Sequence, residues 1–187
     1  MNTGAPIYRQ VLGSEFANLP FEVRAFHSLQ GRVRLSGTVT VTGATTAVGR
    51  LVALALRFPA ESQLETFAFE LDANPLEESW TRIFPARTMR SRLSARGGFL
   101  TEAIGPIRLW FALEASSVQL AMHLRKVTFL GIPVPRSLVP RIHAVEQGDN
   151  GSFRFDVLAT WPGTRHMVAY RGTLDVGPQG EAHDPCV

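Results

Sequence analysis

Apolar and polar residues alternate along most of this chain, from Val33 to Val176. A period of two is typical of a strand that turns one face to an apolar core and the other face to water. The clearest stretches lie at residues 33–41, 67–71, 107–113, 118–124 and 153–157. Because short turn sequences join most of them, the pattern predicts an antiparallel sheet that curls around an apolar interior.

Helical spacing is confined to two places near the N-terminus. Residues 6–28 read as short helices with a break at Leu19-Pro20, and Pro20 suits the first turn of the second one. A further helix is expected over 45–58, after a first strand over 31–43. The fold class expected is α+β, mainly antiparallel β: a curled sheet or lipocalin-like half-barrel of about seven to nine strands. Residues 1–176 are expected to form one domain, followed by a disordered tail over 177–187.

Two local features refine this prediction. The apolar phase shifts by one position between Leu124 and Val127, which predicts a β-bulge at Arg125-Lys126. Residues 131–140 contain three prolines, which cannot donate ladder hydrogen bonds, so this segment must leave the sheet. We expect it to form a flap or plug over one end of the barrel.

Composition and charge narrow the function classes. The net charge is only +3, and Lys126 is the single lysine among 19 basic residues. Five arginines gather between Arg82 and Arg96, but no interleaved aromatic residues or nucleic-acid module accompany them. The longest apolar run, 48–58, is too short to span a membrane, and the N-terminus does not resemble a signal peptide. We therefore expect a cytoplasmic protein with neither a nucleic-acid nor a membrane partner.

The chain shows no sequence signature of a familiar active site. It lacks a nucleophile elbow, a phosphate-binding loop, a dinucleotide fingerprint and a zinc-protease motif. Its five histidines have no ligand-like spacing, and its one cysteine, Cys186, is the penultimate residue. We expect no metal site and no cofactor.

One pair of residues is a candidate for acid–base chemistry. Pairing of the strands on either side of residues 115–117 brings Glu114 or Trp110 within reach of His123. A carboxylate beside a histidine can tune a general base, so Glu114 and His123 are the catalytic candidates. Trp110 and Arg125 share their sheet face and are candidate ligand-binding residues. The alternative, which the pattern favours, is that the charged residues neutralise one another on a wet face.

A second group of candidates lies on other strands. Trp80 and Arg82 share one face and can grip an anionic or aromatic ligand, or else pack against each other at the surface. Arg92, from the arginine cluster, is a further ligand-binding candidate. Tyr170 is in phase with Val168, so we expect a core residue with its hydroxyl at the rim of the barrel.

Several short motifs are spread along most of the chain. They are Tyr8-Arg9-Gln10-Val11-Leu12-Gly13, Leu19-Pro20, Gly31-Arg32 with Gly37, Trp80-Thr81-Arg82, Ser91-Arg92-Leu93, Gly105-Pro106-Ile107-Arg108, Leu130-Gly131-Ile132-Pro133-Val134-Pro135, Pro140-Arg141-Ile142, Phe153-Arg154-Phe155-Asp156-Val157 and Tyr170-Arg171-Gly172. Together these motifs resemble the bacterial DUF4166 family, a domain of unknown function. The resemblance covers about residues 6–176, and it implies a domain that stands alone or is fused to oxidoreductase-like domains. It indicates small-molecule metabolism and supplies no catalytic set.

Three functions remain open at this stage. The leading hypothesis is a barrel that binds a small, largely apolar or aromatic molecule, which predicts a cavity in place of a filled core. The alternative is a cofactor-free isomerase, cyclase or hydrolase of secondary metabolism that uses the same cavity. The third is a solidly packed structural or interaction domain that partners an oxidoreductase.

Overall fold

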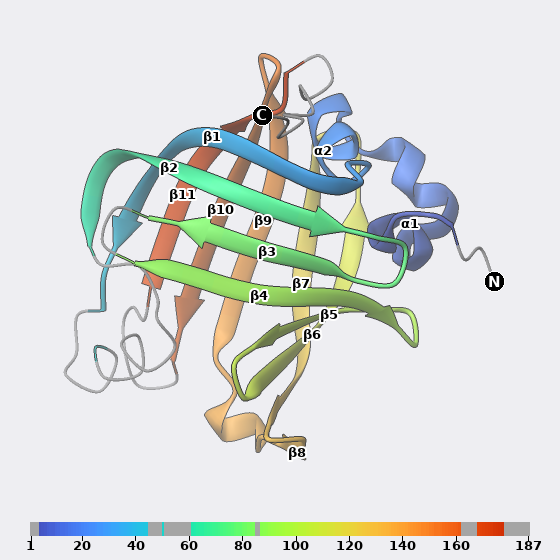
Figure 1. The fold of residues 1–187 in the computed structure, drawn as a ribbon. Coiled ribbons are helices and arrows are strands. Elements are labelled where there is room, and N and C mark those ends of the chain that lie inside the picture. Colours follow the sequence, from blue (N-terminus) through green and yellow to red (C-terminus); the bar gives the residue numbers. More distant parts are fainter. Residues whose placement is uncertain (1–3, 45–49, 51–60, 85–86, 162–167, 178–187) are drawn as a thin grey trace, which may run out of the picture.

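The chain folds into a closed antiparallel β-barrel (Figure 1). The computed structural model describes residues 4–44, 50, 61–84, 87–161 and 168–177. Within these residues ten strands form the barrel wall, and a short additional strand, β8, is attached to β7. The strands are β1 Gly31–Thr42, β2 Ser62–Ala73, β3 Glu78–Ile83, β4 Thr88–Arg96, β5 Phe99–Ile104, β6 Ile107–Ala115, β7 Gln119–Phe129, β8 Ile132–Pro133, β9 Arg141–Asp149, β10 Ser152–Thr160 and β11 Val168–Asp175.

The barrel closes because its first and last strands pair. Each strand from β1 to β7 lies beside the next, β7 pairs with β9, and β11 returns to pair with β1. The expectation of a half-barrel with seven to nine strands was therefore wrong. The alternation of apolar and polar residues is a local pattern, so it predicts individual strands but not which strands pair. Closure of the barrel depends on contacts between residues such as Thr38 and Thr173, which are 135 positions apart.

Glycines allow the close approach of β1 and β11 where they meet. A Cβ atom at Gly37 would overlap the backbone carbonyl oxygen of Thr173. A Cβ atom at Gly172 would overlap the carbonyl oxygen of Thr38 and lie 2.8 Å from the ring of Phe155. Glycine inside a strand is typical of a tight bend or of close backbone contact, and both positions lie in the seam that completes the barrel.

Short helices at the N-terminus cover one end of the barrel. The helical cap, residues 6–28, contains α1 Ile7–Leu12, the 3-10 helix η1 Gly13–Asn18 and α2 Phe21–Phe26, with Pro20 immediately before α2. The helices and the break between them were predicted from the sequence. The cap buries an apolar face against the strands, and the ring of Phe26 stacks on Phe153 of β10 at 4.1 Å between centroids.

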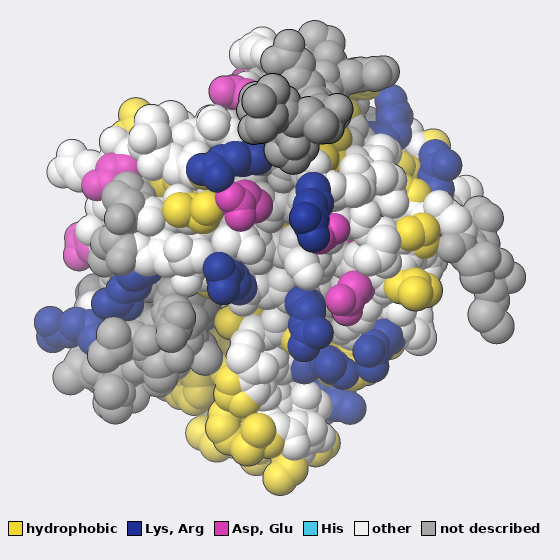
Figure 2. Space-filling model, in the orientation of Figure 1, with side chains coloured by type: hydrophobic (Ala, Val, Ile, Leu, Met, Phe, Trp, Pro, Cys, Tyr) yellow, Lys and Arg dark blue, Asp and Glu magenta, His cyan; other side chains and the backbone are white. Residues whose placement is uncertain are grey.

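The proline-rich segment lies at the opposite end and does not close the barrel. Strand β8 turns back on the end of β7, and the 3-10 helix η2, Arg136–Leu138, follows it. Leu130 and Ile132 are 71% and 70% exposed, and hydrophobic surface gathers at the lower edge of Figure 2, where Figure 1 shows β8. The flap or plug expected over one end of the barrel is therefore present only in part: Val134 and Val139 pack against the core, whereas Ile132 and Leu138 are exposed.

The predicted irregularity in β7 is present. Trp110 is opposite Lys126, whereas Phe111 is opposite Leu124, so Arg125 is the extra residue of a β-bulge. The helix expected over 45–58 and the tail expected over 177–187 fall almost entirely outside the described residues. Among the helices that are described, none is long and apolar enough to cross a membrane.

Candidate functional site

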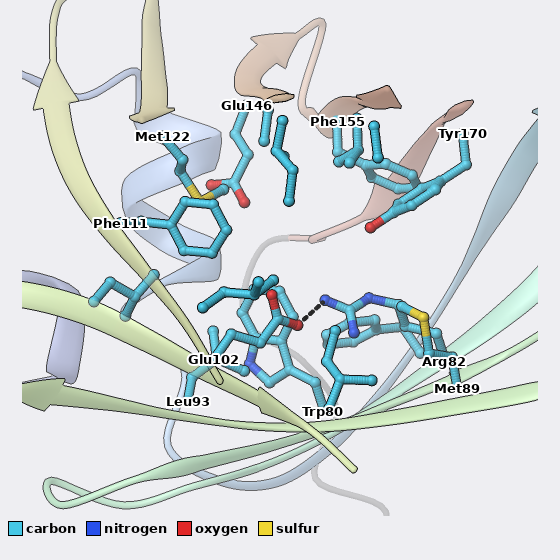
Figure 3. A pocket seen from close by; sticks show the side chains of 18 of the residues that line it. Trp80, Arg82, Met89, Leu93, Glu102, Phe111, Met122, Glu146, Phe155 and Tyr170 are labelled. Carbon is cyan, nitrogen blue, oxygen red and sulfur yellow. Dashed lines mark hydrogen bonds and ion pairs between the residues drawn. The ribbon is translucent and has the colours of Figure 1, made fainter. Parts of the chain in front are cut away.

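The barrel encloses a cavity of about 100 Å³ (Figure 3). Its wall is mainly aromatic and aliphatic, with contributions from the cap and from strands around the whole barrel. Such a wall with a few converging polar groups is typical of a small-molecule site. The polar side chains that reach the cavity are Tyr8, Arg82, Glu102, Glu146 and Tyr170.

Arg82 and Trp80 project from β3 into the interior. The Arg82 guanidinium donates hydrogen bonds to the Ser91 hydroxyl at 3.0 Å and to the Glu102 carboxylate at 3.3 Å. It also lies 4.8 Å from the centroid of the Trp80 ring. The structure thus brings this predicted pair to the cavity, but the positive charge already has a carboxylate partner. An anionic ligand would have to compete with Glu102 for it.

His27 and Glu146 form a buried pair at the capped end of the cavity. His27 follows α2, Glu146 lies on β9, and Nε2 of His27 is 2.6 Å from the nearer carboxylate oxygen. Their side chains are 0% and 5% exposed. In Figure 3 the carboxylate of Glu146 points into the cavity, so its oxygen atoms are available to a bound molecule. His27 does not line the cavity and contacts this carboxylate from the other side.

Tyr8 of α1 places a hydroxyl at the same end. Its ring stacks on His27 with 3.5 Å between the centroids, and the whole side chain is buried. No described residue lies within hydrogen-bond distance of the Tyr8 hydroxyl. Burial raises the pKa of this hydroxyl well above its usual value, and the nearby charge of Glu146 acts in the same direction. The hydroxyl is therefore protonated and able to donate.

Tyr170 contributes a further polar group to the cavity, and Glu78 forms a hydrogen bond with a residue that lines it. Tyr170 of β11 turns its hydroxyl toward the centre of the cavity in Figure 3, and burial raises its pKa to about 12. Its hydroxyl lies inside the barrel, whereas the sequence had indicated the rim. Glu78 is buried on the same face of β3 as Trp80 without lining the cavity, and it accepts a hydrogen bond from Trp80 Nε1 at 2.9 Å. Burial raises the pKa of Glu78, and this favours the neutral acid.

The other predicted site residues lie on the outer wall. The structure brings Glu114 and His123 together at 3.0 Å, but their side chains are 74% and 47% exposed. Neither residue lines the cavity, because Phe111 and Met122 occupy the inward positions of β6 and β7. This geometry matches the alternative interpretation of the sequence, in which the two charged residues neutralise each other on a solvent-exposed face of the sheet.

Trp110, Arg92 and Arg125 are also turned away from the cavity. Lys126 lies 5.3 Å from the centroid of the Trp110 ring, on the outside of β6 and β7. The Trp110 Nε1 atom is buried and has no hydrogen-bond partner among the described residues. Arg92 and Arg125 are exposed. The ligand-binding candidates that reach the interior are thus Trp80, Arg82 and Tyr170.

Sequence reasoning missed Tyr8, His27, Glu102 and Glu146. A signal for the two acids is nevertheless present, because Glu102 is in phase with Leu100 and Glu146 is in phase with Ala144. A charged residue at an apolar position of an alternating strand is costly to bury unless it is paired, so it marks a built polar site. Tyr8 and His27 carry no comparable signal, since each occupies a helical segment that reads as ordinary packing.

No set of three or more histidine, cysteine, aspartate or glutamate side chains within the described ranges is placed to hold a metal ion. The polar groups inside the barrel are instead arranged as two separate pairs, His27 with Glu146 and Arg82 with Glu102.

Fold and site together define a closed antiparallel β-barrel with a helical cap at one end and a cavity that carries paired polar groups. The chain belongs to the DUF4166 family, a domain of unknown function, whose family model matches residues 19–174. The resemblance noted in the sequence is thereby confirmed. No curated protein matches the chain in sequence.

Proposed function

We propose that this barrel binds a small, largely apolar molecule in its interior. The observation that supports the proposal is the cavity of about 100 Å³ with a mainly apolar wall. An apolar cavity of about 150 Å³ in another protein is sufficient to bind benzene. The cavity of this protein is smaller, so the ligand we propose is no larger than a single ring or an aliphatic group of similar size.

The cavity also bears on the choice between binding and a purely structural role. Protein interiors are normally packed to the density of organic crystals. The atoms that line an unfilled cavity lack contacts that a packed interior would provide. A bound molecule would restore the missing contacts. The cavity therefore favours ligand binding over a packed interaction domain for an oxidoreductase partner, because the interior of a packed domain would be filled by side chains.

The proposal can be tested by a substitution that partly fills the cavity with a larger side chain. Ala144 lines it and Ala121, on the neighbouring strand β7, does not. We expect Ala144→Leu to reduce binding of toluene, measured by isothermal titration calorimetry, at least tenfold, while Ala121→Leu leaves it unchanged. Organic extraction of the purified wild-type protein, followed by mass spectrometry, would identify a ligand that co-purifies. Absence of toluene binding together with a clean extract would contradict the proposal.

A cofactor-free enzyme is the second candidate, and Glu146 is the observation that favours it. A carboxylate on the wall of an apolar cavity, held by a histidine, is suited to accept or return a proton. Incubating an extracted molecule with wild-type protein and with Glu146→Gln would distinguish the two functions. An enzyme converts the molecule and the variant does not, whereas a binding protein returns it unchanged in both cases.

A further inference from the structure

We propose that the capped end of the cavity is a subsite for one hydroxyl group of the ligand, with Tyr8 as the hydrogen-bond donor and Glu146 as the acceptor. The inference rests on the proposed binding function and adds the chemical class of the ligand, a small alcohol or phenol. It depends on two polar groups that reach the cavity from different elements, α1 and β9.

The Tyr8 hydroxyl is the first half of the subsite. Tyr8 is fully buried and is one of the residues that line the cavity, and its hydroxyl has no hydrogen-bond partner among the described residues. A buried hydroxyl without a partner is unfavourable, so a ligand atom that accepts its hydrogen bond gains the interaction without breaking one inside the protein. Its ring is held in place by the stack on His27, and this fixes the direction of the hydroxyl.

The Glu146 carboxylate is the second half. His27 occupies one side of one oxygen, at 2.6 Å. A carboxylate has about four lone-pair positions, so acceptor capacity remains on the side that faces the cavity. Because Tyr8 stacks on His27 and His27 contacts Glu146, the hydroxyl and the carboxylate belong to one contiguous group at one end of the barrel.

The chemistry of the two groups selects among polar substituents. A hydroxyl both donates and accepts, so one such group can satisfy Glu146 and Tyr8 together. A carbonyl oxygen accepts from Tyr8 but offers nothing to Glu146. A carboxylate would face the negative charge of Glu146. Arg82, the only cation among the described residues that line the cavity, is paired with Glu102.

The experiment compares single-ring probes that differ in the polar group. Phenol, toluene and benzoate are titrated into the full chain by calorimetry, and the ratio of phenol to toluene affinity is the readout. We expect Tyr8→Phe, which keeps the stacked ring, to lower this ratio about tenfold. Glu146→Gln should also lower it, because the amide oxygen of glutamine is a weaker hydrogen-bond acceptor than a carboxylate oxygen. Glu70→Gln is the matched control: it makes the same change as Glu146→Gln at an exposed glutamate that does not line the cavity, and it should leave the ratio within about twofold.

The outcomes separate the subsite from the function on which it rests. If phenol and toluene both bind, and Tyr8→Phe does not change their ratio, the subsite is wrong and the binding function stands. If benzoate binds more tightly than phenol, the subsite is also wrong, and Arg82 becomes the polar contact. If none of the probes binds to the wild-type protein, the binding function fails and the subsite fails with it.

Discussion

The phenol ring of Tyr8 stacks on the imidazole of His27, with 3.5 Å between their centroids and 24° between their planes. Through His27 this stack is joined to Glu146, 119 residues further along the chain. The helical cap is therefore anchored to the barrel by a buried polar contact as well as by apolar packing. The same contact places the candidate polar subsite at the capped end of the cavity.

The buried pair predicts a large effect of His27→Ala on stability. The substitution leaves Glu146 buried without its partner and removes the surface on which Tyr8 stacks. We expect the free energy of unfolding to fall by about 3 kcal/mol. Urea denaturation followed by circular dichroism measures it, and a loss below about 1 kcal/mol would mean that water replaces the imidazole at little cost.

The exposed pair of His123 and Glu114 provides the comparison for the buried pair of His27 and Glu146. His123→Ala also removes a histidine that contacts a glutamate, but both side chains are largely in water. We expect the free energy of unfolding to change by no more than about 0.5 kcal/mol, because exposed ion pairs contribute little. The same urea experiment applies. Loss of the folded state in this variant would show that His123 has a structural role that its exposure conceals.

Glu78 predicts a dependence of stability on pH. Its pKa in the folded protein is raised above the usual value of 4.5, mainly by burial. The folded state therefore holds a proton that the unfolded chain has released, and this contribution to stability is lost as the pH rises from about 4.5 through the folded pKa. Glu78→Gln, which keeps an acceptor for Trp80 Nε1, should gain stability relative to wild type at pH 7 compared with pH 4. An equal difference at the two pH values would be inconsistent with this account.

The two tyrosines predict a spectroscopic result at high pH. Burial raises the pKa of Tyr170 to about 12 and the pKa of Tyr8 well above its usual value. In the folded protein neither should ionise near pH 10, so tyrosinate absorbance at about 295 nm should appear only above that pH or on unfolding. Stability should fall as the pH rises from 10 toward 12, because the unfolded chain then binds fewer protons than the folded one. A tyrosinate signal near pH 10 while the fold is intact would contradict the burial of these hydroxyls.

Gly172 predicts that the seam between β1 and β11 does not tolerate a side chain. A Cβ atom there would overlap the carbonyl oxygen of Thr38 and crowd the ring of Phe155. We expect Gly172→Ala to lower the free energy of unfolding by about 2 kcal/mol through overpacking. Gly4→Ala is the control, since no atom lies within 4 Å of its added Cβ. Equal midpoints of thermal unfolding for the two variants would show that the seam relaxes without cost.

Local pattern was sufficient to predict much of the barrel wall. Alternation predicts that Trp80 and Arg82 share one face and that Tyr170 is a core residue, and the bulge at Arg125 follows from a phase shift of one residue. The contact between Glu114 and His123 follows from pairing across a short turn. These features depend on residues that are close in sequence, where the period of two and the geometry of a hairpin determine the neighbours.

Local sequence pattern predicted most of the strands and turns, the short N-terminal helices and which residues share a face of the sheet. It did not predict that the sheet closes, that the face bearing Glu114 and His123 is the outer one, or that Tyr8 stacks on His27 and His27 contacts Glu146 inside the barrel. The physical reason is that closure and the docking of the cap bring together residues more than one hundred positions apart. Such contacts depend on how the whole barrel packs, and no local period in the chain encodes them.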